Sequence, residues 1–326
     1  MAAVAIGILG THLSTVADRL ADKTGMGEAL MGGIFLGAST SLSGITASAV
    51  AAAHGYAELS LSNAIGGIAA QMLMLVVADL AYPRVNLEHA AASVESMMQG
   101  ALQITMLGLL LFAFIGPDLS MFGIHYMTPI LPITYIAGMH YISRGLKRPM
   151  WQPRITSETK TDEPQEAPQE GKSLIKIWIN FIATAMGIMA SGWALTVAAE
   201  GIAEKTVLSQ SIMGGLFVAV TTSLAELVTS IAAVRRGALT LAVSGILGGN
   251  AFDALFAAIA DVFYRDGPIY AAVSKREAGL LAITIIMSGL LLLGLLRREK
   301  RGIARIGFEG IGIIIVYAVG IVVLAR

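Results

Sequence analysis

Long apolar runs, separated by short polar connections, make up most of this chain. A helix needs about 20 mainly apolar residues to cross the hydrocarbon core of a bilayer. Ten runs approach or exceed that length, and the first is the weakest because it is alanine-rich and carries His12 and Asp18. The predicted spans are residues 1–20, 29–53, 59–81, 97–116, 122–143, 175–203, 210–234, 239–264, 278–296 and 306–324. The pattern therefore predicts an all-α polytopic membrane protein with ten transmembrane helices.

The composition agrees with a membrane protein. Hydrophobic residues fill 56% of the 326 positions and charged residues only 13%, whereas soluble domains carry about 25% charged residues. The 22 basic and 22 acidic residues leave no net charge, so the basic excess of a nucleic-acid-binding protein is missing. The chain has no cysteine, which excludes disulfides, thiolate metal sites and thiol catalysis. The composition argues against a soluble enzyme, and we expect no nucleic-acid partner.

The positions of the basic residues predict the orientation of the chain. Lys and Arg gather in the cytoplasmic connections of membrane proteins. With the amino terminus outside, 17 of the 22 basic residues fall on the inner side. The five outer ones are Lys205, Arg265, Lys275, Arg276 and Arg326. We therefore expect an integral protein of a prokaryotic cell membrane, surrounded by membrane lipid, with both termini outside.

The longest polar stretch, residues 144–174, follows the fifth span. It contains several prolines and charges of both signs, a composition typical of a flexible linker. We interpret it as a cytoplasmic tether between two five-helix repeats, residues 1–143 and residues 175–326.

The two halves resemble each other at a constant offset of 182 residues, with no gap from about residue 11 to residue 82. The alanine and leucine content of two unrelated helices would not produce polar matches at one fixed offset. The pairs include Lys23 with Lys205, Met31 with Met213, Phe35 with Phe217, Thr40 with Thr222, Ser48 with Ser230 and Asp79 with Asp261.

Five spans per repeat place the two repeats in opposite orientations, because consecutive spans alternate in direction. Inverted repeats are a transporter architecture whose binding site lies near the bilayer midplane, where the repeats meet. Asp79 and Asp261 then lie near opposite faces of the membrane. For this pair a capping or interfacial role is favoured over a role in an ion-access vestibule.

Polar clusters and double glycines interrupt the matching spans. The Ser/Thr clusters are residues 39–43 and 221–223, and the double glycines are Gly66-Gly67 and Gly248-Gly249. Hydroxyl groups compete with the helical hydrogen bonds and can bend a helix. A bend frees carbonyl oxygens, which suit hard cations. Double glycines allow a kink or a close helix crossing.

Only two carboxylates fall deep inside a predicted span, Glu226 and Asp253. An acidic residue at the bilayer centre costs roughly 2.5–3.5 kcal/mol on insertion scales, and no Lys or Arg lies at a comparable depth. A bound cation or protons could neutralise the pair. The alternative is a protonated pair that is hydrogen-bonded between helices. We favour a cation or proton pathway because the Ser/Thr clusters lie at the same level.

These segments resemble a known family. Residues 222–226 and 248–253 are similar to the second signature repeat of the calcium/cation antiporter superfamily, the sodium/calcium exchanger-like proteins, and residues 40–42 and 62–67 are similar to the first. The resemblance covers essentially the whole chain. It implies that Ca²⁺ or another divalent cation is exchanged for Na⁺ or H⁺ by alternating access.

The resemblance also implies which residues bind ions. The matching positions are Glu226, Asp253, Thr40, Ser41, Thr222, Ser223, Gln71, Ser43 and Asn250, with Glu226, Asp253, Thr40 and Thr222 as the metal ligands. The two threonines would contribute backbone carbonyls. The ligands of the protein are then the transported cations, and no other cofactor is expected.

The chain departs from the family pattern at the first-repeat acid, where it has Gly44. Gly67 and Gly249 also occupy positions where the family commonly has serine. At most two negative charges remain, which one divalent cation, two monovalent cations or protons could neutralise. Ca²⁺ usually takes 6–8 oxygen ligands, so the losses weaken a calcium site and a multi-sodium site alike. The alternatives that stay open are a divalent cation antiporter and a monovalent cation/proton antiporter.

Two other classes were weighed against an antiporter. A passive cation channel on the same helices fits less well, because an inverted repeat with a single acidic level suits alternating access better. The sequence gives little support for a membrane-embedded hydrolase, since it has no His-Glu-x-x-His pattern and no Gly-x-Ser-x-Gly elbow. We therefore do not expect an enzyme.

Overall fold

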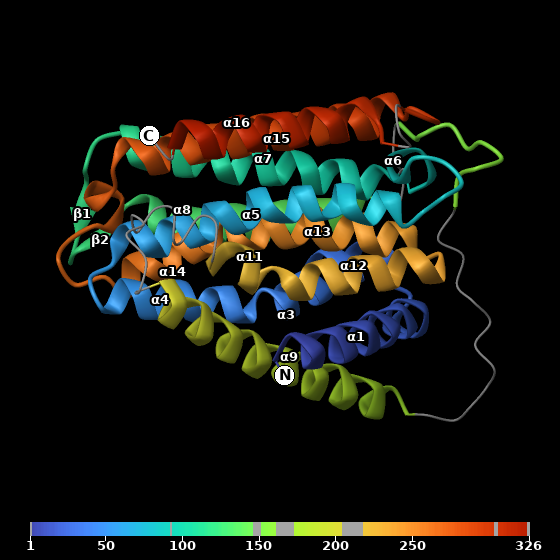
Figure 1. The fold of residues 1–326 in the computed structure, drawn as a ribbon, viewed down its shortest axis with the longest axis horizontal. Helices are drawn as coiled ribbons and strands as arrows, with labels where there is room; N and C mark the ends of the chain where they lie inside the picture. The colour runs from blue at the N-terminus through green and yellow to red at the C-terminus, as the bar shows by residue number, and fades with distance from the viewer. Residues whose placement is uncertain are drawn as a thin grey trace.

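The computed structural model describes residues 2–91, 93–145, 151–160, 173–203, 218–302 and 306–324. Its long helices run roughly side by side in one bundle (Figure 1). The helical elements of the first half, long and short, are α1 (Ala2–Thr24), α2 (Gly27–Leu30), the π-helix η1 (Met31–Leu36), α3 (Gly37–Thr40), α4 (Leu42–Ala53), α5 (Ala57–Leu80), α6 (Leu87–Ala90), α7 (Val94–Ile115) and α8 (Met127–Gly145). In the second half they are α9 (Leu174–Ala203), α11 (Ala219–Thr222), α12 (Leu224–Arg236), α13 (Leu239–Asp253), α14 (Leu255–Phe263), the 3₁₀ helix η3 (Ile269–Ala272), α15 (Lys275–Arg297) and α16 (Phe308–Leu324).

The structure confirms the expected helical class, and each of the ten predicted ranges contains a described helix. The one sheet among the described residues is a two-residue antiparallel pair, β1 (Ser120–Met121) with β2 (Ile124–His125). Five described helices are long and apolar enough to cross a membrane by themselves, and six if the bent pair of residues 27–40 and 42–53 counts as one span. The number of crossings therefore stays a prediction.

Two helices break at equivalent serines, as the Ser/Thr clusters predict. Ser41 separates α3 from α4 with φ −76° and ψ −5°, and Ser223 separates α11 from α12 with φ −87° and ψ 5°. The first break bends the chain by 45°. In both cases the preceding threonine donates its hydroxyl to a carbonyl one turn earlier, Thr40 to Gly37 at 2.9 Å and Thr222 to Ala219 at 3.0 Å. These local bonds compete with the regular helix and help to end it.

Helix α13 crosses η1 and the start of α3 so closely that the backbones touch. A Cβ atom on Gly37 would lie 2.7 Å from the Cα of Gly249, and one on Gly248 would collide with the backbone of Gly33. Small residues allow this approach between helices in a membrane. The double glycine Gly248-Gly249 therefore forms the predicted close crossing, whereas α5 continues unbroken through Gly66-Gly67.

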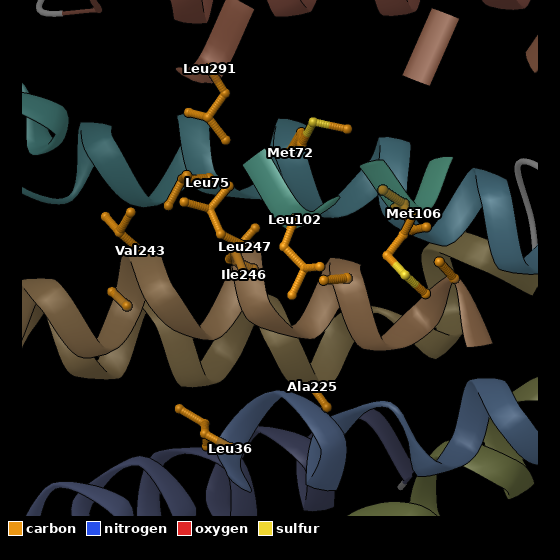
Figure 2. Close-up of a cluster of buried hydrophobic side chains, with 14 of the residues drawn as sticks. Leu36, Met72, Leu75, Leu102, Met106, Ala225, Val243, Ile246, Leu247 and Leu291 are labelled. Carbon is orange, nitrogen blue, oxygen red and sulfur yellow. The ribbon is translucent and has the colours of Figure 1, made fainter. Parts of the chain in front are cut away.

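The crossing lies beside the apolar core of the bundle. Figure 2 shows core side chains that include Met72 and Leu75 from α5, Leu102 and Met106 from α7, Val243, Ile246 and Leu247 from α13, and Leu291 from α15. The most apolar 18-residue stretches of α5 and of α13–α14 are 89% and 78% buried. The corresponding stretches of the other single helices of span length are 28–44% buried. Helices α5 and α13 are therefore the central elements, and the others surround them.

Asp79 and Asp261, which are 182 positions apart, fasten equivalent turns. The Oδ1 of Asp79 accepts a hydrogen bond from the backbone N–H of Leu87 at 2.6 Å. The Oδ1 of Asp261 accepts one from the backbone N–H of Ile269 at 2.8 Å, again eight residues further on. These bonds favour the capping role over the vestibule. They also extend the likeness of the two repeats from sequence to contacts.

Part of the predicted linker packs against the bundle. Residues 151–160 lie beside α6 and the connection between α15 and α16: the backbone N–H of Lys160 donates to the carbonyl of Ala90 at 2.9 Å, and Lys300 pairs with Glu158 at 2.6 Å. Other residues that carried predictions lie outside the described residues. They are linker residues 146–150 and 161–172, and the repeat positions Lys205, Met213 and Phe217.

Short helix α6 buries a carboxyl group. Glu88 is 3% exposed, and its side chain interacts with that of Glu309. Two neighbouring carboxylates repel each other, so the neutral form of one of them is favoured. Burial, followed by the nearby charges of Asp79 and Glu309, raises the pKa of Glu88 well above its ordinary value.

We predict that Gly248→Ala destabilises the protein, because a methyl group there must push α13 away from Gly33. The thermal midpoint should fall by about 5 °C or more, since 1 kcal/mol corresponds to roughly 2–4 °C in larger domains. The control is Gly108→Ala on α7, where an added methyl group would meet nothing within 4 Å. Equal midpoints for the two variants in detergent would show that the close crossing is not required.

We also predict that stability falls as pH rises. The folded-state pKa of Glu88 is raised, so the contribution of its neutral form is complete below the unfolded-state pKa, about 4.3, and is lost as pH rises through the folded-state pKa. Glu88→Gln keeps a neutral hydrogen-bonding group at all pH values, so its thermal midpoint should depend less on pH than that of the wild type. Glu95→Gln, at the start of α7, is the control and should follow the wild type. A Glu88→Gln curve parallel to the wild type would contradict this account.

Candidate functional site

A small cavity lies where the two broken helices meet α5 and the α13–α14 junction. It measures about 10 Å³, close to the smallest space that holds one water molecule. Its lining residues are Ser41, Gly44, Asn63, Gly67, Gln71, Thr222, Ser223, Glu226, Asp253 and Phe256. Both helix breaks, at Ser41 and Ser223, therefore border the cavity.

Helix α5 contributes one polar stripe to the cavity. Asn63, Gly67 and Gln71 are spaced by four residues, which places them on one face of a helix. The amide of Asn63 donates to the carbonyl of Gly44 at 3.2 Å and to the hydroxyl of Ser48 at 2.8 Å. The hydroxyl of Thr222 lies 3.5 Å from the Asn63 Oδ1. Asn63 thus connects the first-repeat wall of the cavity to the second.

Two carboxylates meet at the cavity from different helices. Glu226, in the first turn of α12, is 3% exposed, and Asp253, the last residue of α13, is 2% exposed. The Ser41 hydroxyl lies 3.5 Å from Glu226 Oε1 and also interacts with Asp253. The Gln71 amide donates to Asp253 Oδ2 at 2.6 Å. Since Gln71 and Asp253 are separated by 182 residues, the two repeats meet here through equivalent positions.

Three oxygen atoms at the cavity have no hydrogen-bond partner among the residues that the structure describes. They are Oε2 of Glu226, Oδ1 of Asp253 and Oε1 of Gln71, and all three are buried. Unpartnered buried acceptors are rare because each loses its hydration without replacement. No Lys, Arg or His side chain lines the cavity among the described residues. The arrangement is therefore suited to a positively charged ligand or to protons on the carboxylates.

The structure brings most of the predicted site residues together. Six of them reach the site: Glu226, Asp253, Gln71, Ser41, Thr222 and Ser223 line the cavity. Three predicted residues do not line it. Thr40 bonds to its own helix and interacts with Glu226, Ser43 donates to the Thr222 carbonyl at 3.4 Å, and Asn250 lies 3.4 Å from the side chain of Gln103. Ion binding by these nine residues stays a prediction.

Two lining residues were missed by the sequence reasoning. Asn63 precedes Gly67 by one helical turn, and this spacing could have placed it beside the site. Phe256 carries no such signal, since an aromatic residue in an apolar span resembles any core residue. A Cβ atom on Gly44 would lie 2.6 Å from the ring carbon Cε2 of Phe256. The ring therefore fills the space beside the position where the family pattern has an acid.

Comparisons with known proteins agree with this arrangement. The family described as sodium/calcium exchanger protein matches residues 1–137 and 176–326, so both repeats match and the predicted linker does not. A search of curated proteins found no match.

Solved structures share the fold. One is the sodium-calcium exchanger NCX_Mj soaked with 2.5 mM Na⁺ and 0.1 mM Ca²⁺, with a TM-score of 0.71 and 20% identity over 100% of this chain and 96% of that one. The same exchanger soaked with 2.5 mM Na⁺ and 0.1 mM Sr²⁺ gives a TM-score of 0.70 at 20% identity, covering 98% and 95% of the two chains. With 10 mM Na⁺ and no Ca²⁺ the values are 0.66 and 21%, covering 98% of each chain.

The family match covers most of the chain and leaves out the predicted linker, and the solved exchanger has the same fold. This protein therefore belongs to the sodium/calcium exchanger protein family, a family of membrane cation exchangers.

Proposed function

We propose that this protein is a secondary antiporter that carries its cation at Glu226 and Asp253 and works by alternating access. The observation that carries the proposal is the set of three unpartnered oxygens, on Glu226, Asp253 and Gln71, around a cavity that holds one water-sized particle. A cation bound there would satisfy all three oxygens and offset the charge of both carboxylates. A hydrogen-bonded structural pair would leave no such set of oxygens unpartnered.

The size and charge of the cavity favour exchange of one divalent cation for protons. Two carboxylates carry two negative charges, which one divalent cation or two protons would neutralise. A cavity of about 10 Å³ has room for one ion, so two Na⁺ ions could not share it in this conformation. Protons need no room of their own, because each would bind directly to a carboxylate oxygen. This stoichiometry would make the exchange electroneutral.

A monovalent cation/proton antiporter is the second candidate, and it is favoured by Gly44. The missing first-repeat acid removes one charged ligand, and Ca²⁺ affinity depends on the number of charged ligands. The two candidates share the site and the coupling to protons. They differ in the cation, which a comparison of Ca²⁺, Mg²⁺, Mn²⁺, Na⁺ and K⁺ flux distinguishes.

The two broken helices would be the moving part in alternating access. Ser41 and Ser223 occupy equivalent positions in inverted repeats and border the same cavity. In transporters of this architecture, one repeat rocks against the other around a fixed site. Exchange of roles between the segment before Ser41 and the segment before Ser223 would expose the carboxylates first to one side and then to the other.

Flux through purified protein in proteoliposomes tests the proposal. We expect Ca²⁺ uptake when the vesicle interior is more acidic than the medium, and little change when valinomycin and K⁺ impose a membrane potential. An outward Na⁺ gradient in place of the proton gradient tests the coupling ion. Uptake that follows voltage alone, with no counter-ion on the opposite side, would identify a channel and overturn the proposal.

We predict that Glu226→Gln and Asp253→Asn each reduce Ca²⁺ uptake driven by the proton gradient at least a hundredfold, because each removes one of the two charges that hold the cation. Glu95→Gln, which lies outside the cavity, is the matched control and should transport at the wild-type rate. Each variant should elute as a monodisperse peak, since the amide occupies the same space as the carboxylate. Normal flux in both variants would remove Glu226 and Asp253 from the transport site.

We further predict that a restored first-repeat acid needs room. Gly44→Glu by itself would press against the ring of Phe256, so it should gain little divalent affinity. The double variant Gly44→Glu/Phe256→Ala should bind Ca²⁺ about tenfold more tightly than Phe256→Ala alone, a change of roughly 1.4 kcal/mol. Calorimetric titration of the three variants measures this difference. Equal affinities for the double variant and Phe256→Ala would show that residue 44 does not face the bound ion.

A further inference from the structure

A second cavity, of about 300 Å³, lies at the end of the bundle where the linker packs. It is lined by residues 82–86, between α5 and α6, and by Arg301 and Gly302, between α15 and α16. The backbone N–H of Asn86 donates to the carbonyl of Lys300 at 3.1 Å, which holds the two connections together. The cavity therefore lies between the first and second repeats and is separate from the carboxylate site.

The charged side chains that line this cavity are all basic. Its charged members are both arginines, Arg84 and Arg301, and no carboxylate lines it among the described residues. Neither guanidinium forms a hydrogen bond or an ion pair with another described residue. Asn86 is 2% exposed, and its Nδ2 has no hydrogen-bond partner within the described part of the chain. Two fixed positive charges and a buried amide donor therefore border one space.

This donor set fits a phosphate group. Guanidinium groups bind phosphate oxygens through paired, charge-assisted hydrogen bonds, and a buried N–H donor without a partner gains a bond when a phosphate oxygen approaches. A cation would face two arginines, and an uncharged ligand would leave both charges unused. The chemistry of the cavity therefore selects an anion with several acceptor oxygens.

The surroundings of the cavity favour a lipid as the source of that phosphate. Val77 and Leu80, in the last turns of α5, are 44% and 50% exposed although most of this helix is buried. Leu80 is two residues before Tyr82, which lines the cavity, and Val77 is one helical turn before Leu80, so an apolar surface lies next to the cavity. Basic pockets at the cytoplasmic end of membrane helices bind anionic headgroups, and the basic residues of this chain place these two connections on the predicted inner side.

We propose that the cavity between residues 82–86 and Arg301 binds the phosphate of an anionic phospholipid, with Arg84 and Arg301 pairing with its charge and Asn86 donating a hydrogen bond. The acyl chains would lie along Val77 and Leu80. Because the cavity is formed by connections from both repeats, the bound lipid stabilises the packing between them.

The test measures thermal midpoints of the full-length protein in neutral detergent with added phosphatidylglycerol, phosphatidylcholine or sodium phosphate. We expect phosphatidylglycerol alone to raise the midpoint, with saturation. In Arg84→Gln/Arg301→Gln the apparent affinity for phosphatidylglycerol should fall at least tenfold. Arg235→Gln, an exposed arginine on the same predicted side, is the control and should keep it.

A second variant tests the site while both arginines are kept. Asn86→Asp has the same shape but replaces the N–H donor with a carboxylate that repels a phosphate, so it should weaken phosphatidylglycerol binding, measured as the shift from the lipid-free midpoint of the same variant. Equal shifts from phosphatidylcholine, or equal losses in Arg235→Gln, would overturn the proposal. An equal shift from sodium phosphate would overturn the lipid assignment and identify a site for the free anion.

Discussion

One electrostatic constraint dominates the site: two carboxylates share a cavity whose described lining contains no basic side chain. Glu226 and Asp253 approach from α12 and α13, and both are almost fully buried. Two like charges in a medium of low dielectric repel each other and lose their hydration. Such a pair persists only if a positive ligand or protons offset its charge. The need for a mobile positive partner is the physical basis of the proposed transport.

The rest of the bundle holds these carboxylates in place. The close crossing at Gly248 and Gly249 brings α13 against η1, and Asp253 is only four residues beyond the second of these glycines. The helices break at Ser41 and Ser223, beside the cavity, so hydroxyl groups rather than a continuous helix face the site. A binding site at the junction of two repeats can be reached from either side when the repeats move. The same junction therefore accounts for the position of the site and for its proposed mechanism.

Much of this arrangement can be predicted from the sequence because it depends on local chemistry. Apolar runs indicate the helices, and threonine followed by serine indicates the helix breaks. The constant offset of 182 residues shows that Gln71 and Asp253 are equivalent positions. Long-range packing is not encoded in this way. Nothing in the sequence places the Phe256 ring against Gly44, and nothing places Asn250 beside Gln103 instead of the cavity. The docking of residues 151–160 on α6 was missed for a related reason, because a polar stretch rich in proline gives no periodic signal.

The central claim is that a cation and protons compete for the same two carboxylates. Proton release on cation binding tests it most directly: purified protein in weakly buffered solution is titrated with CaCl₂ while the pH and the bound Ca²⁺ are measured. The account predicts release of up to two protons for each Ca²⁺ bound, and none in a Glu226→Gln/Asp253→Asn variant. Tight Ca²⁺ binding by the wild type with no proton release at any pH would contradict it.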